Sequence, residues 1–193
     1  MARPTRATAR PVEAPASKTG PRVQALLLSL ALTALTALTG CGMNESDDVP
    51  FAGTATSSAA ADEAERASGE IRDLIGIEGR ASDTGPGVSD CSDRDPEKFF
   101  RIFHAWSFTP ASTAGLDGMM EHLEEELPKH GWKVAEYGRD TSMNKNLQLT
   151  ADNDGKKHSV NIVHRAKQNP PKLSLMLVSG CYRVPEGEKV ERF

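Results

Sequence analysis

An uncharged apolar run at residues 25–38 limits how much of this chain can take part in a fold. It holds only Ala, Leu, Ser and Thr, and five basic side chains against one acidic side chain precede it. About 14 residues are too few for a membrane-spanning helix, which needs roughly 20, but they fit the apolar core of a secretory signal, roughly 7–15. We therefore expect residues 1–40 to be a signal peptide, which leaves about 150 residues for one domain and a linker.

The four residues that end this signal, Leu38, Thr39, Gly40 and Cys41, look like a bacterial lipobox. The resemblance implies that Cys41 is linked to diacylglycerol through a thioether and becomes the first residue after cleavage. A thiol suits that role because it supplies a ready nucleophile. The alternative is an ordinary secretory signal with a chance cysteine at its end. We expect a lipoprotein that a lipid on Cys41 holds at the outer, extracytoplasmic face of the cell membrane.

The chain after residue 40 is acidic. The whole sequence has 23 Lys and Arg and 27 Asp and Glu. Residues 1–40 contain five of the basic and one of the acidic residues. Residues 41–193 therefore contain 18 basic and 26 acidic residues and carry a formal charge of −8. Nucleic acids and anionic lipid surfaces are bound by basic patches. The charge therefore argues against a nucleic-acid partner and against direct adhesion to anionic lipid.

The first half of the remaining chain shows little apolar patterning. Residues 41–61 are rich in Gly, Ser, Thr, Ala and acidic side chains, which is typical of a flexible tether. A helix is expected over residues 64–75, where apolar side chains recur at spacings of three and four. These side chains are Ala64, Ala67, Ile71, Leu74 and Ile75. Residues 79–96 are expected to be a loop, since Gly, Pro, Ser and Asp dominate them.

The second half has the periodicities of strands and one more helix. Residues 99–108 alternate at strand period and are rich in aromatic side chains. A helix is expected at 114–127, ended by Pro128 and Gly131. Further strands are expected at 132–137, 146–151, 159–165 and 172–182. The domain, residues 62–185, is thus predicted to be α+β, with helices packed on a mainly antiparallel sheet of about five strands in the order α-β-α-β-β-β-β, followed by a polar tail at 186–193.

The direction of each strand bears on the two remaining cysteines, Cys91 and Cys181. A helix between the first two strands makes them point the same way, and three short connections then alternate the others. The last strand therefore ends where the first begins, which brings Cys181 to the end of the sheet next to Cys91. An even pair in an exported domain is typical of a disulfide. We expect this disulfide, with two free thiols as the alternative.

The sequence contains none of the metal-binding or catalytic motifs considered below. None of the five His residues has the spacing of a zinc site. Residues 152–155, Asp-Asn-Asp-Gly, favour a hairpin turn over a calcium loop, because the glycine comes too early and no glutamate occupies the twelfth position. No serine lies in a G-x-S-x-G motif. We expect no metal and no cofactor.

Short stretches across the domain carry a family resemblance. They are residues 38–41, GPGVSDC at 85–91, HGWK at 130–133 and SGCY at 179–182. Together they resemble a group of small actinobacterial lipoproteins with no assigned activity. The resemblance implies an exported, membrane-anchored domain and supplies no catalytic residue.

These observations predict a non-catalytic binding or accessory module of the cell envelope, whose partner is a peptide, an envelope polymer or another envelope protein. Strand 99–108 has apolar residues on both faces, so we expect a groove between the first helix and the sheet, lined by Trp106 or Phe103 with His104 at its edge. Two alternatives remain: an envelope hydrolase with His104 as its base, and a purely structural envelope protein.

Overall fold

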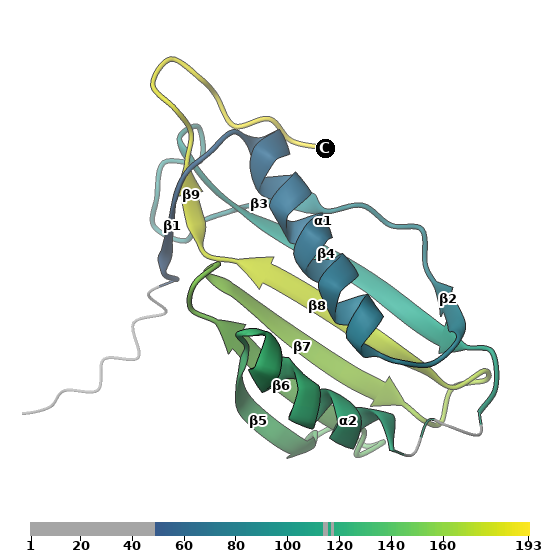
Figure 1. Ribbon diagram of the computed structural model, residues 1–193. Helices are drawn as coiled ribbons and strands as arrows, with labels where there is room; N and C mark the ends of the chain where they lie inside the picture. Colours follow the sequence, from purple (N-terminus) through teal and green to yellow (C-terminus); the bar gives the residue numbers. More distant parts are fainter. Residues whose placement is uncertain (1–48, 114–115, 117) are drawn as a thin grey trace, which may run out of the picture. The chain divides into compact units, whose positions relative to one another are not determined.

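The computed structural model describes residues 49–113, 116 and 118–193, and these form an α+β fold of two α-helices and a large curled sheet (Figure 1). The predicted signal peptide, Cys41 and the first residues of the predicted tether lie outside the described residues. The helices are α1 (Ser57–Leu74) and α2 (Met119–Glu126), and a 3-10 helix, η1 (Leu127–His130), follows α2. The strands are β1 (Phe51–Thr54), β2 (Gly79–Ala81), β3 (Gly87–Asp90), β4 (Phe99–Pro110), β5 (Lys133–Arg139), β6 (Leu147–Asn153), β7 (His158–Arg165), β8 (Lys172–Ser179) and β9 (Cys181–Arg183).

The five predicted strands are confirmed as β4 to β8, with β9 continuing the last of them. The sheet runs β1-β9-β4-β8-β7-β6-β5, and every pair from β4 to β5 along this order is antiparallel. It follows that β4 and β5 point the same way, as the predicted helical connection between them requires. The sheet is larger than predicted, because β1 pairs with β9, and β2 and β3 pair with the outer edge of β4.

Strand β4 is the centre of the fold. It bonds β8 and β9 along one edge and β2 and β3 along the other. Because side chains alternate along a strand, its even-numbered residues share one face. These are Phe100, Ile102, His104, Trp106 and Phe108, and all of them are buried. That face carries the core.

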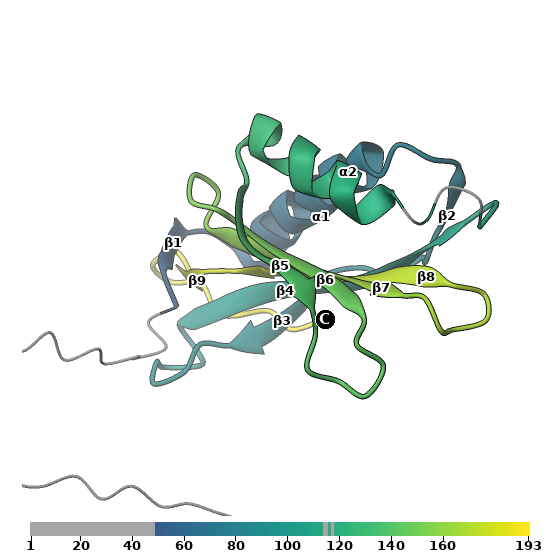
Figure 2. The ribbon, with the colours of Figure 1, turned by 90° about the horizontal axis from the view of Figure 1, so that it is seen from below.

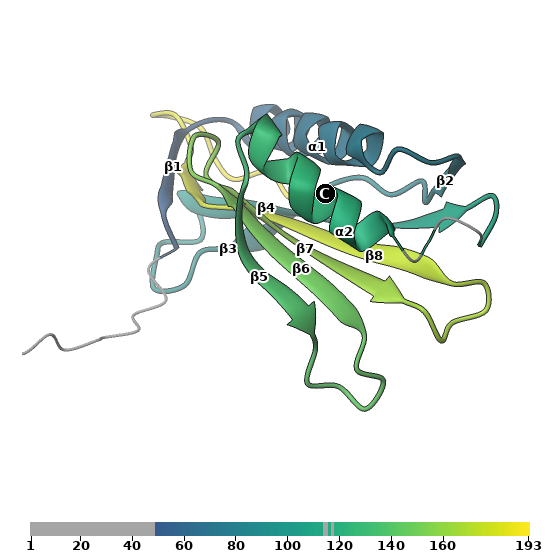
Figure 3. The same cartoon turned by 60° about the horizontal axis from the view of Figure 1, so that its bottom comes forward.

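Both helices lie on the same face of the sheet (Figure 2). Helix α1 contacts β4 and β8, and α2 contacts β6 (Figure 3). Apolar residues on both faces of β4 left two options for the face opposite to α2, cover by the first helix or no cover, and no described helix covers it. The other face holds the odd-numbered residues of β4, and Phe103 and Met176 of β8 are exposed there.

Helix α1 begins earlier than predicted. Thr56 caps it, since its hydroxyl accepts a hydrogen bond from the Ala59 amide at 3.2 Å. Ala60, Ala61 and Ala64 in its first turns are buried against the sheet, because side chains this small allow a close approach. The predicted tether therefore ends before this helix. The small side chains that were interpreted as a sign of flexibility instead allow α1 to pack closely on the sheet.

The predicted tether is also wrong at residues 51–54, which form β1. Strand β1 pairs in parallel with β9, and the Cys181 amide donates to the Pro50 carbonyl at 2.8 Å. Gly180 makes this approach possible, because a Cβ on it would lie 2.3 Å from the Pro50 oxygen. The polar tail is attached as well: the Glu191 amide donates to the Ser57 hydroxyl at 3.1 Å, and Arg192 pairs with Asp90.

Replacing Gly180 by Ala should therefore detach β1. The new methyl group would collide with a backbone carbonyl, which cannot move away without breaking the Cys181–Pro50 hydrogen bond. Overpacking of this kind costs about 1–3 kcal/mol. Amide hydrogen exchange should show faster exchange at Cys181, while a Gly138→Ala control, where a Cβ has open space, should leave it unchanged. Equal protection of Cys181 in both variants would contradict this account of Gly180.

Residues 79–96, predicted to be a loop, contain two short strands instead. The glycines that suggested a loop lie against phenylalanine rings: a Cβ on Gly87 would lie 2.5 Å from Phe103 Cζ, and one on Gly79 would lie 2.3 Å from Phe108 Cζ. Glycine in a strand often marks such a close approach. Each of these glycines makes room for one aromatic ring of β4.

The predicted end of the second helix is confirmed. Helix α2 gives way to η1 at Leu127, Pro128 lies in the first turn of η1, and Gly131 ends η1 with a φ of +82°. A left-handed glycine is a common way to end a helix. Met119, Met120, Leu123 and Leu127 are buried in the shared core.

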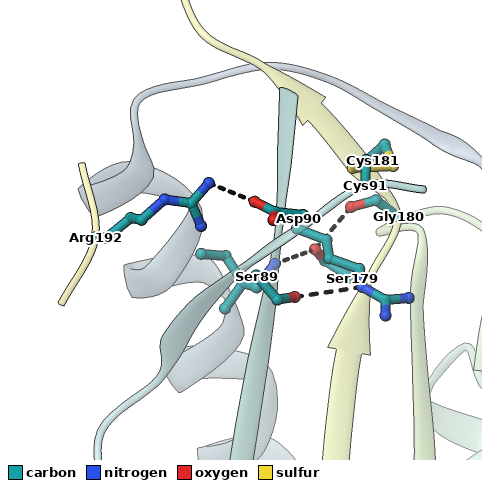
Figure 4. The surroundings of a disulfide bond; sticks show 9 residues. Ser89, Asp90, Cys91, Ser179, Gly180, Cys181 and Arg192 are labelled. Carbon is teal, nitrogen blue, oxygen red and sulfur yellow. Dashed lines mark hydrogen bonds and ion pairs between the residues drawn. A yellow bond between two sulfur atoms is a disulfide. The ribbon is translucent and has the colours of Figure 1, made fainter. Parts of the chain in front are cut away.

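The predicted disulfide between Cys91 and Cys181 is present (Figure 4). Cys91 directly follows β3 and Cys181 begins β9, so the bond joins the two sides of β4. The two Cα atoms are 6.0 Å apart and both residues are buried. Next to the bond, the Ser179 hydroxyl accepts from the Ile102 amide and donates to the Gly180 carbonyl, each at 2.8 Å.

Candidate functional site

A cleft of about 630 Å³ opens between α1 and the chain segment that follows β2. One wall is the exposed side of α1, the other is residues 81–84, and β4 supplies the floor. Its lining residues are Asp62, Glu65, Arg66, Ser68, Gly69, Arg72, Ala81, Ser82, Asp83, Thr84, His104 and Trp106. The outer edge of β4 is hydrogen-bonded here by the residues between β2 and β3. These residues run alongside α1, and the cleft lies between them and the helix.

A second, larger hollow of about 1200 Å³ continues from this cleft toward the far end of β4. It shares Arg72, Ala81 and Ser82 with the first and reaches residues 107–111. Because the two hollows share these residues and both lie along α1, we describe them together and call them the α1 groove.

The structure places two of the three predicted groove residues in the α1 groove. His104 and Trp106 lie on the helix-covered face, with ring centroids 6.5 Å apart, and both line the cleft. Phe103 does not. It lies on the opposite face, against Gly87, because neighbouring residues of a strand point to opposite faces. The predicted groove is therefore corrected to His104 and Trp106.

His104 has two hydrogen-bond partners, and they fix its tautomer. Its Nε2 lies 2.7 Å from the Thr84 carbonyl oxygen, and its Nδ1 lies 2.9 Å from Ser68 Oγ. A carbonyl oxygen only accepts, so Nε2 carries the hydrogen. In the neutral ring Nδ1 is then an acceptor, and the Ser68 hydroxyl donates to it. His104 thus links α1, β4 and the 81–84 wall.

The rim of the α1 groove carries charges of both signs. Asp62, Glu65 and Asp83 are exposed, and within the part of the chain that the structure describes they form no ion pair. Arg66 pairs with Glu63, and Arg72 Nε lies 3.6 Å from the exposed Asp73 carboxylate. Exposed pairs of this kind are weak. The guanidinium of Arg72 is therefore free to meet a ligand.

Sequence reasoning missed Ser68 and Thr84. Ser68 had a readable signal, since it lies on the buried face of α1 with Ala64 and Ile71, at spacings of four and three. A polar side chain on such a face needs a partner. Thr84 had none, because its backbone carbonyl, rather than its side chain, binds His104.

A second buried histidine lies outside the groove. His158 is 3% exposed, and neither of its ring nitrogens has a hydrogen-bond partner among the described residues. Burial lowers its pKa below 6.5, and Lys156 adds to this effect, while Glu63 and Glu70 oppose it. His158 is therefore neutral near pH 7.

In residues 49–113, 116 and 118–193, no three His, Cys, Asp or Glu side chains lie together as ligands for a metal ion. Neither α-helix of this part is long and apolar enough to cross a membrane.

Comparisons with known proteins find no match to this chain among protein-family models, curated proteins or solved structures.

Proposed function

We propose that this protein is a lipoprotein of the cell envelope, anchored by a lipid on Cys41, whose domain binds an extended ligand in the α1 groove. The observation that carries the proposal is the groove itself, which runs along α1 over a floor of Trp106 and His104. A long, partly apolar cleft with a few polar groups is the usual form of a ligand site. This is a binding role, in which the protein holds an envelope component near the membrane.

The position of the groove supports this role. Nine residues lie between Cys41 and Phe51, and the ten residue-to-residue steps span at most about 35 Å. An anchor on Cys41 would hold the β1 end of the domain near the lipid. The α1 groove extends to the opposite end of β4, near Pro110. Its far end would therefore face away from the membrane.

The charges at the rim favour a peptide or a peptide-bearing polymer as the ligand. Carboxylates of Asp62, Glu65 and Asp83 and the guanidinium of Arg72 lie on the same groove. A peptide offers amines and carboxylates that can pair with both. Nucleic acid does not suit this rim, because its phosphates would meet three carboxylates.

Replacing Cys41 by Ser tests the anchor. The variant should lose incorporation of radiolabelled palmitate, and it should either be released into the medium or accumulate as an unprocessed precursor. Cys91→Ser, which keeps the lipobox, is the matched control and should still be labelled. Equal labelling of Cys41→Ser and the natural protein would refute lipidation at Cys41 and leave the groove proposal to its own test.

Fluorescence of Trp106 tests the groove. In Trp132→Phe protein, Trp106 is the only tryptophan, and it lines the cleft. Peptides and polymer fragments prepared from the envelope should shift its emission in a saturable way, with a Kd in the micromolar range or below. The matched Trp106→Phe protein keeps the buried Trp132 and should show no shift. An emission maximum typical of a dry core, unchanged by every fraction, would reject binding over Trp106.

A further inference from the structure

We propose that Ser68 and His104 form a nucleophile and general base in the α1 groove, and that the cleft cleaves short-chain carboxylic esters by acyl transfer to Ser68. This activity goes beyond ligand binding. It does not depend on the lipid anchor, so it can fail or succeed separately from the proposed function.

The first observation is the hydrogen-bond chain. Ser68 Oγ lies 2.9 Å from His104 Nδ1, and His104 Nε2 lies 2.7 Å from the Thr84 carbonyl. A serine nucleophile needs a neutral base within about 2.6–3.2 Å, and the base needs a third group that fixes its orientation. The Thr84 carbonyl holds the hydrogen on Nε2 and thereby leaves Nδ1 free to take the serine proton. Thr84 acts through His104 and is a positioning residue.

The second observation is a cation beside the serine. Gly69 directly follows Ser68 on α1, and a Cβ on Gly69 would lie 4.0 Å from Arg72 Nη2. The guanidinium therefore lies beside Gly69, and both residues line the cleft. A guanidinium in this place can stabilise the negative charge that develops on an ester oxygen.

The third observation is access. Ser68 and His104 are 4% and 6% exposed, yet both line the 630 Å³ cleft. The indole of Trp106 lies beside His104 on the same floor. An acyl chain of a few carbons can pack on this indole while its carbonyl carbon approaches Ser68. We therefore assign the substrate class as esters of short carboxylic acids.

The reaction balances without a cofactor. Ser68 Oγ forms a bond to the carbonyl carbon, its proton moves to His104 Nδ1, and the carbonyl electron pair moves to the oxygen facing Arg72. The bond to the alcohol then breaks, and the alcohol leaves with the proton from Nδ1. Water repeats the sequence on the acyl-serine, releases the carboxylic acid and restores Ser68.

Labelling of the full chain by a fluorophosphonate probe tests the proposal. This probe reacts with serines that a neighbouring base activates. The natural protein should take up one probe, and peptide mapping should place it on Ser68. Ser68→Ala should lose labelling and hydrolysis of p-nitrophenyl butyrate, while His104→Gln should slow both by roughly 100-fold or more. Ser58→Ala, which removes an exposed hydroxyl from the same helix outside the lining of the α1 groove, should keep both.

The labelled position separates catalysis from a structural hydrogen bond, because a serine that is only hydrogen-bonded would not react with the probe. Mapping on the natural protein needs no variant, so misfolding of His104→Gln cannot decide the outcome. If the natural protein remains unlabelled while a reference serine hydrolase reacts in the same tube, or if the probe maps to another residue, the proposal is overturned.

Discussion

Replacing Cys181 by Ala should lower the free energy of unfolding by about 4–5 kcal/mol. The bond to Cys91 joins residues 90 positions apart. In the chain-entropy model, closing a loop of that length removes about 4.6 kcal/mol of conformational freedom from the unfolded chain. The loss should be close to this value, because both cysteines are buried and the bond holds β3 to β9 across the start of β4.

Urea denaturation of the natural protein and the Cys181→Ala variant, with and without reductant, measures this effect. The double variant Cys91→Ala with Cys181→Ala is the matched control, and it should resemble the single variant within about 1 kcal/mol because the two changes act on one bond. Reductant should destabilise the natural protein alone. Two titratable thiols in freshly purified natural protein would show that the bond is absent.

Four of the five strands that the sequence predicted have a common property. Strands β4, β6, β7 and β8 each run for seven residues or more and alternate between buried and less buried positions. Alternation over such a length is a strong local signal. The directions of these strands were inferred from the connections between them alone. The proximity of Cys91 and Cys181 was inferred in the same way.

The strands that the sequence missed depend on contacts far along the chain. Strands β1, β2 and β3 have three or four residues each and contain glycine, so their local composition resembles that of a loop. Each is a strand because it bonds β4 or β9. Gly180 and Gly87 show the physical reason, since each lies against a distant group that a side chain would displace. Such a reason cannot be read from neighbours in sequence.

The candidate site was predictable only in part. The apolar alternation of β4 placed Trp106 and His104 on one face, and the structure puts both in the α1 groove. The same alternation should have excluded Phe103, which is one residue out of phase. Ser68 and the Thr84 carbonyl reach His104 from 36 and 20 positions away, and no spacing rule links them.

Replacing His158 by Leu should stabilise the protein, by about 1–3 kcal/mol at pH 7, which is the usual cost of a buried polar group without a partner. Neither ring nitrogen has a hydrogen-bond partner among the described residues, so no other group would lose a bond. Leucine has a similar volume and would suit the apolar neighbours on that face of the sheet, such as Val160.

The stabilisation by His158→Leu should grow as the pH falls. Burial keeps the folded pKa of His158 below the value of 6.5 expected in the unfolded chain. As the pH falls from about 6.5, the unfolded chain binds a proton at His158, while the folded chain does not until its lower pKa is reached. The free energy of unfolding of the natural protein therefore decreases over this interval, by about 1.4 kcal/mol for each unit of difference between the two pKa values. The variant lacks this contribution.

Urea denaturation of the two proteins at pH 7.5, 6.5, 5.5 and 4.5 measures the difference. Charged groups facing His158 also respond to pH, so Glu70→Gln on α1 serves as a control. It removes a carboxylate that raises the pKa of His158 and pairs with Lys156 at 2.8 Å. This change should steepen the loss of stability below pH 6.5, because protonated His158 then has one less anion beside it. A difference between His158→Leu and the natural protein that is the same at all four pH values would show that His158 titrates equally in both states, contrary to its burial under α1.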